Sequence, residues 1–112
     1  MNEEINCKIG GVIWIELEDG TRVGHGKIDL LARAGELGSL RQAAIEMGIS
    51  YRQAWYKINQ MNCAASQPLL NLKRGGKDGG KAELTDFGKQ VIHLFHEKQD
   101  LFNRFLSEQA HK

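Results

Sequence analysis

The sequence has little of what marks secreted, membrane-spanning or disordered proteins. Its 112 residues include one proline, two cysteines and 7% aromatic residues. No apolar run approaches the roughly 20 residues that cross a bilayer, and residues 1–6 are acidic where a signal peptide would be basic and then apolar. Cys7 and Cys63 follow no metal-binding or redox spacing. We therefore expect a folded cytoplasmic protein with reduced cysteines and no membrane partner.

Positive charge is concentrated in the middle of the chain, although the formal net charge is only +1. Four basic and seven acidic side chains give residues 1–38 a net charge of −3, and four basic and five acidic ones give residues 83–112 a net charge of −1. Residues 39–82 carry seven basic and two acidic side chains, a net charge of +5. Such a segment is typical of a protein that binds a polyanion. An unevenly charged, solvated surface is the alternative, and charge does not decide between them.

This basic segment contains a predicted helix, residues 50–62, whose two faces differ in chemistry. Ser50 and the glutamine three positions later have the spacing of a capping box. Ala54, Ile58 and Met61 recur at helical spacing and predict a buried stripe, with the tryptophan after Ala54 at its edge. The other face has long polar or aromatic side chains and no acid: Tyr51, Arg52, Gln53, Tyr56, Lys57 and Gln60. This is the surface expected of a helix that enters a DNA major groove.

A second short helix is predicted directly before it, over about residues 39–47. Ser39 and Gln42 repeat the capping pattern, and Gly48 is expected to end the helix. Two short helices joined by a tight turn that contains glycine form a helix-turn-helix, here at about residues 39–62.

A hairpin with a glycine-rich, basic tip is predicted after the helix-turn-helix, at about residues 69–85. Its two strands flank a loop that contains four glycines and two lysines. Glycines let the backbone lie close to a phosphate strand or in a minor groove, and lysines neutralise phosphate charge. A hairpin at this place after a helix-turn-helix is a wing.

A further hairpin is predicted at the N-terminus, over residues 8–23. Apolar and polar side chains alternate along residues 8–18, which predicts a strand. Asp19-Gly20 predicts a type I′ turn, because both central positions of that turn need a positive φ. An isolated hairpin is only marginally stable, so this one must dock on another part of the protein.

Between this hairpin and the helix-turn-helix, a helix is expected from about residue 27 to residue 33. Its apolar side chains Ile28, Leu31 and Ala32 would be buried. Gly35 and Gly38 follow, and we expect them to interrupt the helix.

The last helix is predicted over about residues 86–107, with Thr85 or Asp86 as its cap, and it has two apolar seams. The first seam consists of Phe87, Val91, Leu94, Leu101 and Phe105, interrupted by Lys98. The second seam consists of Ile92, Phe95, Phe102 and Leu106. Because this is more apolar surface than one side of a small domain covers, we infer that the second seam meets its copy in a homodimer. A helix that only wraps its own core is the alternative.

No catalytic, metal or cofactor site is indicated. The glycine-rich loop resembles a phosphate-binding P-loop, but Ala82 stands where that motif needs Ser or Thr, and a strand follows it. His93 and His96 are three residues apart without a third or fourth metal ligand nearby in sequence. Cys63 has no neighbouring base that would make it a nucleophile. We expect neither enzymatic activity nor a cofactor.

Several motifs resemble those of a known family. Residues 38–44 spell Gly-Ser-Leu-Arg-Gln-Ala-Ala, and residues 48–55 spell Gly-Ile-Ser-Tyr-Arg-Gln-Ala-Trp. Ile58-Asn59, Met61-Asn62, the run Gly-Gly-Lys-Asp-Gly-Gly and Leu84-Thr85-x-x-Gly88 follow. Together they resemble the DNA-binding domain of ModE-type molybdate-responsive transcriptional regulators, which is similar to the LysR-type winged helix.

The resemblance runs from about residue 24 to residue 95 and implies a winged helix that dimerises on a roughly palindromic operator. It also implies that residues 50–53 lie at the DNA groove and the wing lysines on phosphate. The full-length regulators continue into molybdate-binding domains, whereas this sequence stops after one helix. We therefore expect a stand-alone form, and the resemblance does not extend to oxyanion sensing; any effector is unknown.

The sequence thus predicts an α+β, mainly α, winged helix-turn-helix protein that binds double-stranded DNA and regulates transcription, with a link to molybdenum or oxyanion metabolism implied by the resemblance. The residues expected to contact DNA are Arg41, Ser50, Tyr51, Arg52, Gln53, Tyr56, Lys57, Lys73, Arg74, Lys77 and Lys81. The main alternative is a winged-helix adaptor that binds another protein and has no operator, and a weaker one is an RNA-binding winged helix.

Overall fold

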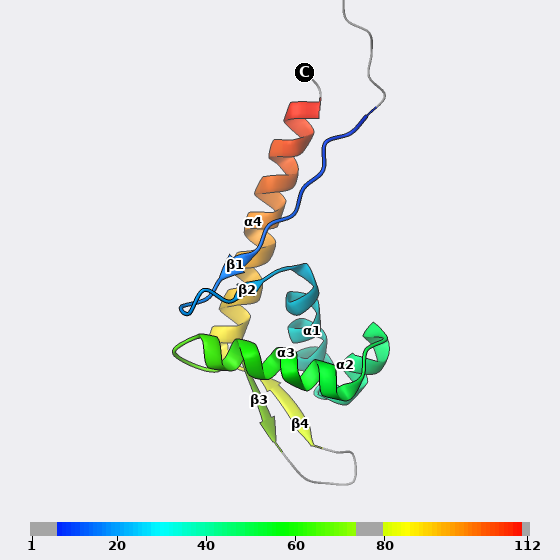
Figure 1. The fold of residues 1–112 in the computed structure, drawn as a ribbon, viewed down its shortest axis with the longest axis vertical. Coiled ribbons are helices and arrows are strands. Elements are labelled where there is room, and N and C mark those ends of the chain that lie inside the picture. The colour runs from blue at the N-terminus through cyan, green and yellow to red at the C-terminus, as the bar shows by residue number, and fades with distance from the viewer. Residues whose placement is uncertain (1–6, 74–79, 111–112) are drawn as a thin grey trace, which may run out of the picture.

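The computed structural model describes residues 7–73 and 80–110. Within these residues the elements are β1 (Ile15–Glu16), β2 (Arg22–Val23), α1 (His25–Leu37), α2 (Leu40–Met47), α3 (Tyr51–Ala64), β3 (Leu70–Lys73), β4 (Lys81–Leu84) and α4 (Asp86–Ala110). The strands form two antiparallel pairs, β1 with β2 and β3 with β4. The predicted α+β, mainly α, winged helix-turn-helix is confirmed (Figure 1). None of the described helices is long and apolar enough to cross a membrane.

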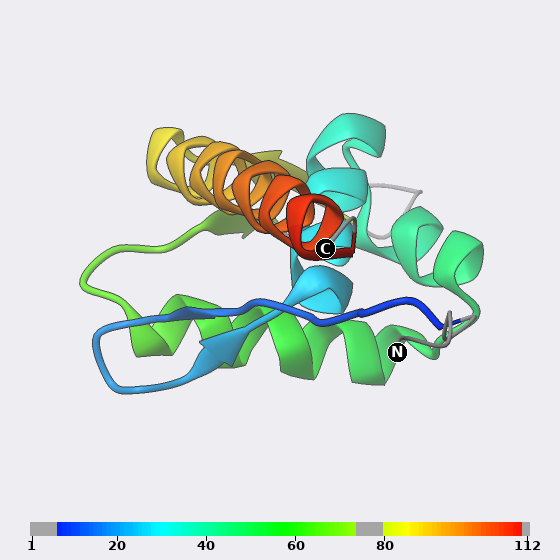
Figure 2. The same cartoon turned by 90° about the horizontal axis from the view of Figure 1, so that it is seen from above.

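Helix α1 lies at the centre of the fold, between α4 and α3 (Figures 1 and 2). The side chains that it buries in the core are Ile28, Leu30, Leu31 and Ala34. Ala32, which was also predicted to be buried, is only half-buried. The helix is longer than the expected residues 27–33 and continues through Gly35, where a Cβ would lie only 3.0 Å from the Leu84 Cβ. Gly35 therefore serves close packing of α1 on β4, and the expectation that it interrupts the helix is wrong. Gly38, with a φ of 67°, ends α1.

Helices α2 and α3 form the predicted helix-turn-helix, and local hydrogen bonds fix their ends. Ser39 Oγ accepts a hydrogen bond from the Gln42 N–H at 3.1 Å, and Gly48 ends α2 with a φ of 69°. At the start of α3, Ser50 and Gln53 form the predicted capping box, with donor–acceptor distances of 3.0 and 3.1 Å. The predicted buried stripe of α3 is confirmed by three side chains without solvent exposure: Ala54, Ile58 and Met61.

A side-chain amide fastens the wing to the end of α3. Asn62 Oδ1 accepts hydrogen bonds from the N–H groups of Leu69 at 2.8 Å and Leu70 at 3.2 Å. Asn62 Nδ2 donates to the Leu70 carbonyl at 2.8 Å. The three bonds fix the direction in which β3 leaves α3.

The other side of the wing is joined to α4 through Thr85. The Thr85 Oγ1 accepts a hydrogen bond from the Gly88 N–H at 2.9 Å, so Thr85 is the N-cap of α4. The same hydroxyl donates to the Pro68 carbonyl at 2.8 Å, and the Thr85 N–H donates to the Leu69 carbonyl at 3.1 Å. A side chain at position 88 would collide with the Leu69 carbonyl, so the first turn of α4 requires a glycine at this position.

The N-terminal hairpin is shorter than predicted. The strand expected over residues 8–18 is reduced to Ile15–Glu16, because β2 offers only two residues for pairing before α1 begins. The turn is not of type I′, since Gly20 has a positive φ of 90° and Asp19 does not. Both predictions are therefore wrong. The predicted alternation is confirmed from Ile13 to Glu18, with the apolar side chains turned inward.

The tip of this hairpin docks on the end of α3. The Asp19 N–H donates to the Ala64 carbonyl at 3.2 Å, and the Ser66 N–H donates to Glu18 Oε1 at 2.9 Å. The hairpin thereby satisfies a carbonyl in the last turn of α3 that has no partner within the helix.

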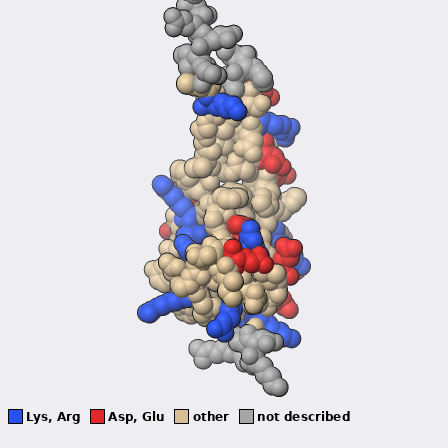
Figure 3. Space-filling view, turned by 90° about the vertical axis from the view of Figure 1, so that its right-hand side faces the viewer, with Lys and Arg blue, Asp and Glu red and all other residues tan. Residues whose placement is uncertain are grey.

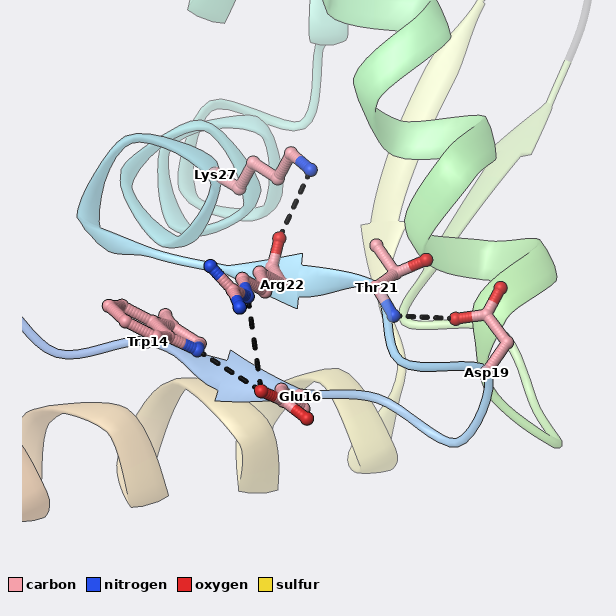
Figure 4. Close-up of polar contacts among 6 residues, drawn as sticks. All are labelled: Trp14, Glu16, Asp19, Thr21, Arg22 and Lys27. Atoms are coloured by element: carbon pink, nitrogen blue, oxygen red, sulfur yellow. Dashed lines mark hydrogen bonds and ion pairs between the residues drawn. The ribbon is translucent and has the colours of Figure 1, made fainter.

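A lysine from α1 joins the hairpin to α3 a second time. Lys27 Nζ donates to the Arg22 carbonyl and to Gln60 Oε1, each at 3.1 Å. Figure 4 shows the hairpin side of this arrangement, in which Trp14 and Arg22 both approach the Glu16 carboxylate. The Arg22 guanidinium also lies 4.6 Å from the centre of the Trp14 ring, a cation–π contact.

Helix α4 spans 25 residues, and its second half extends beyond the other helices (Figure 1). Residues 7–14 run beside it without regular secondary structure, and Gly11 lies against the Phe102 ring. In the first half, Val91 and Phe95 are buried in the core. The prediction that Phe95 faces a second copy is therefore wrong, because its ring has no exposed surface within its own chain.

The remaining apolar side chains of α4 divide between its two sides. Four of them are half-buried: Phe87, Ile92, Phe102 and Leu106. Three from the first seam are exposed by 41%, 46% and 53%, respectively: Leu94, Leu101 and Phe105. The first half of α4 thus packs one side on the chain's own core, whereas the side that carries Leu94, Leu101 and Phe105 leaves apolar surface open to solvent.

The pH dependence of stability should reveal the docking of the hairpin tip. Hydrogen bonding from the Ser66 side chain and N–H lowers the pKa of Glu18 below its ordinary 4.5, and Thr21 likewise lowers the pKa of Asp19 below 3.8. A carboxylate with a lowered pKa stabilises the folded state above its ordinary pKa, and this stabilisation disappears as the pH falls through the lowered value. We expect the free energy of unfolding, measured by urea denaturation between about pH 3 and 7, to decline below about pH 4.5.

The variant Glu18→Gln should flatten this decline, since it removes one titrating group. Glu108→Gln changes an exposed carboxylate near the far end of α4 and is the matched control. A decline of the same size in the Glu18→Gln variant and in the wild type would contradict the assignment.

Replacing Asn62 by alanine should weaken the whole fold. Three part-buried hydrogen bonds disappear and the N–H of Leu69 loses its acceptor, so we expect a loss of about 2–4 kcal/mol in the free energy of unfolding. Asn59→Ala, an exposed asparagine on the same helix, should change stability by less than about 0.5 kcal/mol. Equal stabilities of the two variants in urea denaturation would refute the role of Asn62.

Candidate nucleic-acid interface

A groove of about 580 Å³ lies between the helix-turn-helix and the wing, and we call it the wing groove. Its four basic side chains come from four elements: Arg41 from α2, Arg52 from α3, Lys73 from β3 and Lys81 from β4. Its other lining residues are Ser39, Leu40, Tyr51, Trp55, Leu72 and Gly80. The structure therefore brings together five of the residues predicted to contact DNA.

Hydrogen bonds hold the two walls of the wing groove at a fixed separation. The Ala82 N–H of β4 donates to the Gly38 carbonyl at 3.0 Å, directly before the cap of α2. On the α3 side, Asn62 holds β3. At the outer end of the described wing, Lys73 and Lys81 stand opposite each other in the strand register. Cations held in such a frame need little reordering when an anion binds.

A second, smaller hollow of about 330 Å³ lies on the outer side of α3, and we call it the reading face. Its lining residues are Ser50, Arg52, Gln53, Tyr56 and Lys57. All of them are exposed except Lys57, which is half-buried. Arg52 lines both the wing groove and the reading face, so the two surfaces are continuous.

Both surfaces are positively charged without a compensating acid. Within the described ranges 7–73 and 80–110, none of their basic side chains takes part in an ion pair. Arg33 binds the carboxylates of Asp29 at 3.0 Å and Glu46 at 2.9 Å, so the only acid of α2 is held by another residue. These two contacts, that of Asp29 first, raise the pKa of Arg33. In Figure 3, basic side chains border the end of the molecule beside the wing, and acidic ones lie mostly farther up.

The capping box limits what two of the predicted contact residues can offer. Gln53 Oε1 accepts the Ser50 N–H, and Ser50 Oγ accepts the Gln53 N–H. The Gln53 side-chain amide therefore retains its N–H groups for a ligand, and Ser50 acts first as the cap that orders the start of α3. Arg74 and Lys77, also predicted to contact phosphate, lie outside the described residues.

Sequence reasoning missed the part that Trp55 plays in the wing groove. The helical pattern put this residue at the edge of the buried stripe, but its side chain is 45% exposed and lines the groove. A signal was present, since Trp55 follows Tyr51 by four residues and therefore shares its face of the helix. The contribution of Leu72 had no signal, because a strand residue that points into a groove looks like any exposed apolar residue.

Comparison with characterised proteins finds relatives, although no protein-family model matches the chain. It is 41% identical over 76 residues to the molybdenum-pterin-binding protein MopB of Rhodobacter capsulatus, which covers 68% of this chain and 28% of MopB. It is 42% identical over 69 residues to the DNA-binding transcriptional dual regulator ModE of Escherichia coli K12, which covers 62% of this chain and 26% of ModE. The molybdenum transport protein ModE of Azotobacter vinelandii is 33% identical over 81 residues, 72% of this chain and 30% of that protein.

The chain spans about a quarter to a third of the length of these relatives. Their names describe regulators and molybdenum-related binding and transport proteins, and none of the three names an enzyme. The motifs from residue 38 to residue 88 had indicated the same relationship. The resemblance is thereby confirmed, and this chain is a relative of the ModE-type molybdate-responsive regulators.

Proposed function

We propose that this protein is a sequence-specific DNA-binding regulator of transcription. The observation that carries the proposal is the continuous surface of the wing groove and the reading face, which holds five cations and no acid: Arg41, Arg52, Lys57, Lys73 and Lys81. A fixed, basic, concave surface suits the phosphates of a duplex. Relatives named as transcriptional regulators support the same function.

Helix α3 would enter the major groove with its N-terminal half, as the second helix of a helix-turn-helix does. Its 14 residues extend about 21 Å, and its first two turns expose Tyr51, Arg52 and Tyr56. Arg52 can donate two parallel hydrogen bonds to guanine O6 and N7. Because its oxygen is already used in the cap, Gln53 would read acceptors on a base edge. The tyrosines would contact backbone or a thymine methyl, and Lys57 would reach bases or a flanking phosphate.

The wing groove would hold the phosphate backbone beside the groove that α3 enters. Arg41, Lys73 and Lys81 would approach the phosphates from both walls of the wing groove. Contacts of this kind orient a protein on the duplex and carry no sequence information themselves. By sequence, Arg74 and Lys77 extend the same positive charge toward the tip of the wing.

We propose further that two copies bind a roughly palindromic site as a homodimer. One side of α4 exposes Leu94, Leu101 and Phe105, and Phe102 and Leu106 lie half-buried next to them. An apolar strip of this kind on a protruding helix is typical of a self-association surface. Each copy would then present one α3 to one half-site.

Selection of bound sequences from a random DNA library tests the proposal as a whole. Enrichment of one palindromic motif is the expected result, and its position in the genome would identify the regulated genes. The names of the relatives lead us to propose genes of molybdenum or oxyanion metabolism. Absence of any enriched sequence, with a protein co-purifying instead, would favour the adaptor.

Substitutions on the two surfaces should affect DNA binding in different ways. Arg52→Ala should weaken binding to the selected operator by about 1–3 kcal/mol and relax specificity at one base pair. Lys81→Ala should weaken binding to operator and scrambled duplexes alike, and reduce the slope of log K against log salt by about 1. Fluorescence anisotropy titrations at several salt concentrations measure both effects.

Lys89→Ala removes the same charge from the exposed side of α4 and is the control for these titrations. It should change neither affinity nor salt slope appreciably. Indistinguishable behaviour of Arg52→Ala and Lys81→Ala would contradict the division between the two surfaces.

A charge on the open side of α4 should dissociate the dimer. Phe105→Glu introduces a carboxylate where the ring is 53% exposed, so the fold should survive while the apolar contact between copies is lost. Light scattering should give the mass of a monomer for this variant and of a dimer for Ser107→Glu, which adds the same charge at an exposed polar position nearby. An unchanged dimer mass for Phe105→Glu would exclude this interface.

A further inference from the structure

The wing groove contains apolar surface that contacts to phosphate do not use. Leu40 is almost completely buried beneath it, whereas Trp55 and Leu72 are 45% and 37% exposed. The three come from α2, α3 and β3, and so from both walls of the groove. The four basic side chains line the same walls, so the groove offers both apolar and positively charged surface.

Folding does not require a large aromatic ring to remain half exposed at this place. The neighbouring stripe of α3 already fills the core, and its three side chains are fully buried. Exposed apolar surface inside a concave site is more typical of a contact with a ligand. The walls of the groove around the ring are also fixed, because hydrogen bonds from Ala82 and Asn62 set the positions of both wing strands.

A DNA backbone offers the complementary groups, since each negatively charged phosphate is followed by a weakly polar deoxyribose. We infer that Trp55 is a specificity-determining residue of the wing groove, where its ring packs against one deoxyribose whose flanking phosphates bind Arg41, Lys73 and Lys81. The inference rests on the proposed function and adds to it the selection of sugar type. A ribose would bring a 2′-hydroxyl to an apolar surface that offers it no hydrogen-bond partner.

The test uses the full chain and the operator duplex obtained by selection, with single ribonucleotides introduced one position at a time along each strand. One position in each half-site should weaken binding of the wild type about tenfold, the fold-change that corresponds to a hydroxyl buried without a partner. In Trp55→Ala, affinity for the all-DNA duplex should fall, and that position should no longer discriminate ribose from deoxyribose. Trp55→Leu, which keeps an apolar side chain, should discriminate by an intermediate factor and covers the case that Trp55→Ala folds poorly.

Tyr56→Ala on the reading face is the matched control, since it should reduce affinity while the tenfold effect of the ribonucleotide persists. In a Trp14→Phe background, the remaining tryptophan emission should shift to shorter wavelength on binding the all-DNA duplex, because the ring leaves water. Wild-type binding that tolerates a ribonucleotide at every position would overturn the inference. Discrimination that persists in Trp55→Ala, or a tryptophan shift that single-stranded DNA produces equally well, would also overturn it.

These outcomes differ from a failure of the proposed function. If no duplex sequence is enriched in the selection, the regulator proposal itself fails. If an operator is found and Arg52→Ala relaxes its specificity as expected, the ribonucleotide series then tests Trp55 independently.

Discussion

The arrangement of the candidate DNA-binding surface depends on the side-chain amide of Asn62. Its three hydrogen bonds join the last turns of α3 to the first residues of the wing, so the angle between them is fixed by one residue. The Ala82–Gly38 bond fixes the wing to the end of α1, and the Thr85 hydroxyl fixes it to α4. Together, these hydrogen bonds place the four basic side chains of the wing groove around one space. Without them, its four cations would belong to independent elements.

The motifs that first suggested a family include residues that hold the wing in place as well as residues of the candidate DNA-binding surface. Met61-Asn62 supplies one buried side chain and the amide that holds the wing. Leu84-Thr85-x-x-Gly88 supplies the cap of α4 and the glycine that the Leu69 carbonyl requires. A resemblance in such residues indicates a shared framework, whereas recognition of a particular operator depends on the side chains displayed on it.

Features that depend on near neighbours in sequence were predictable. The caps at Ser39 and Ser50, the buried stripe of α3 and the wing all follow from spacings of a few residues. Apart from the turn at Asp19-Gly20, which is not of type I′, the errors arose where distant residues decide. Gly35 stays helical because Leu84 packs on it, the first strand is cut short by the start of α1, and Phe95 is buried by the chain's own core. Trp55 was misjudged for the same reason, because the wing that completes its groove lies about 20 residues farther on.

The contact between Glu18 and Ser66 joins residues that are 48 positions apart, whereas Asn62 reaches its partners seven and eight positions away. Closing a longer loop costs more chain entropy, so local contacts tend to form first. The helix-turn-helix and the base of the wing can therefore assemble early in folding, and the N-terminal hairpin can close onto α3 only afterwards. The hairpin precedes α3 in the chain and is therefore synthesised before it, yet it is in this way among the last elements to reach its final position.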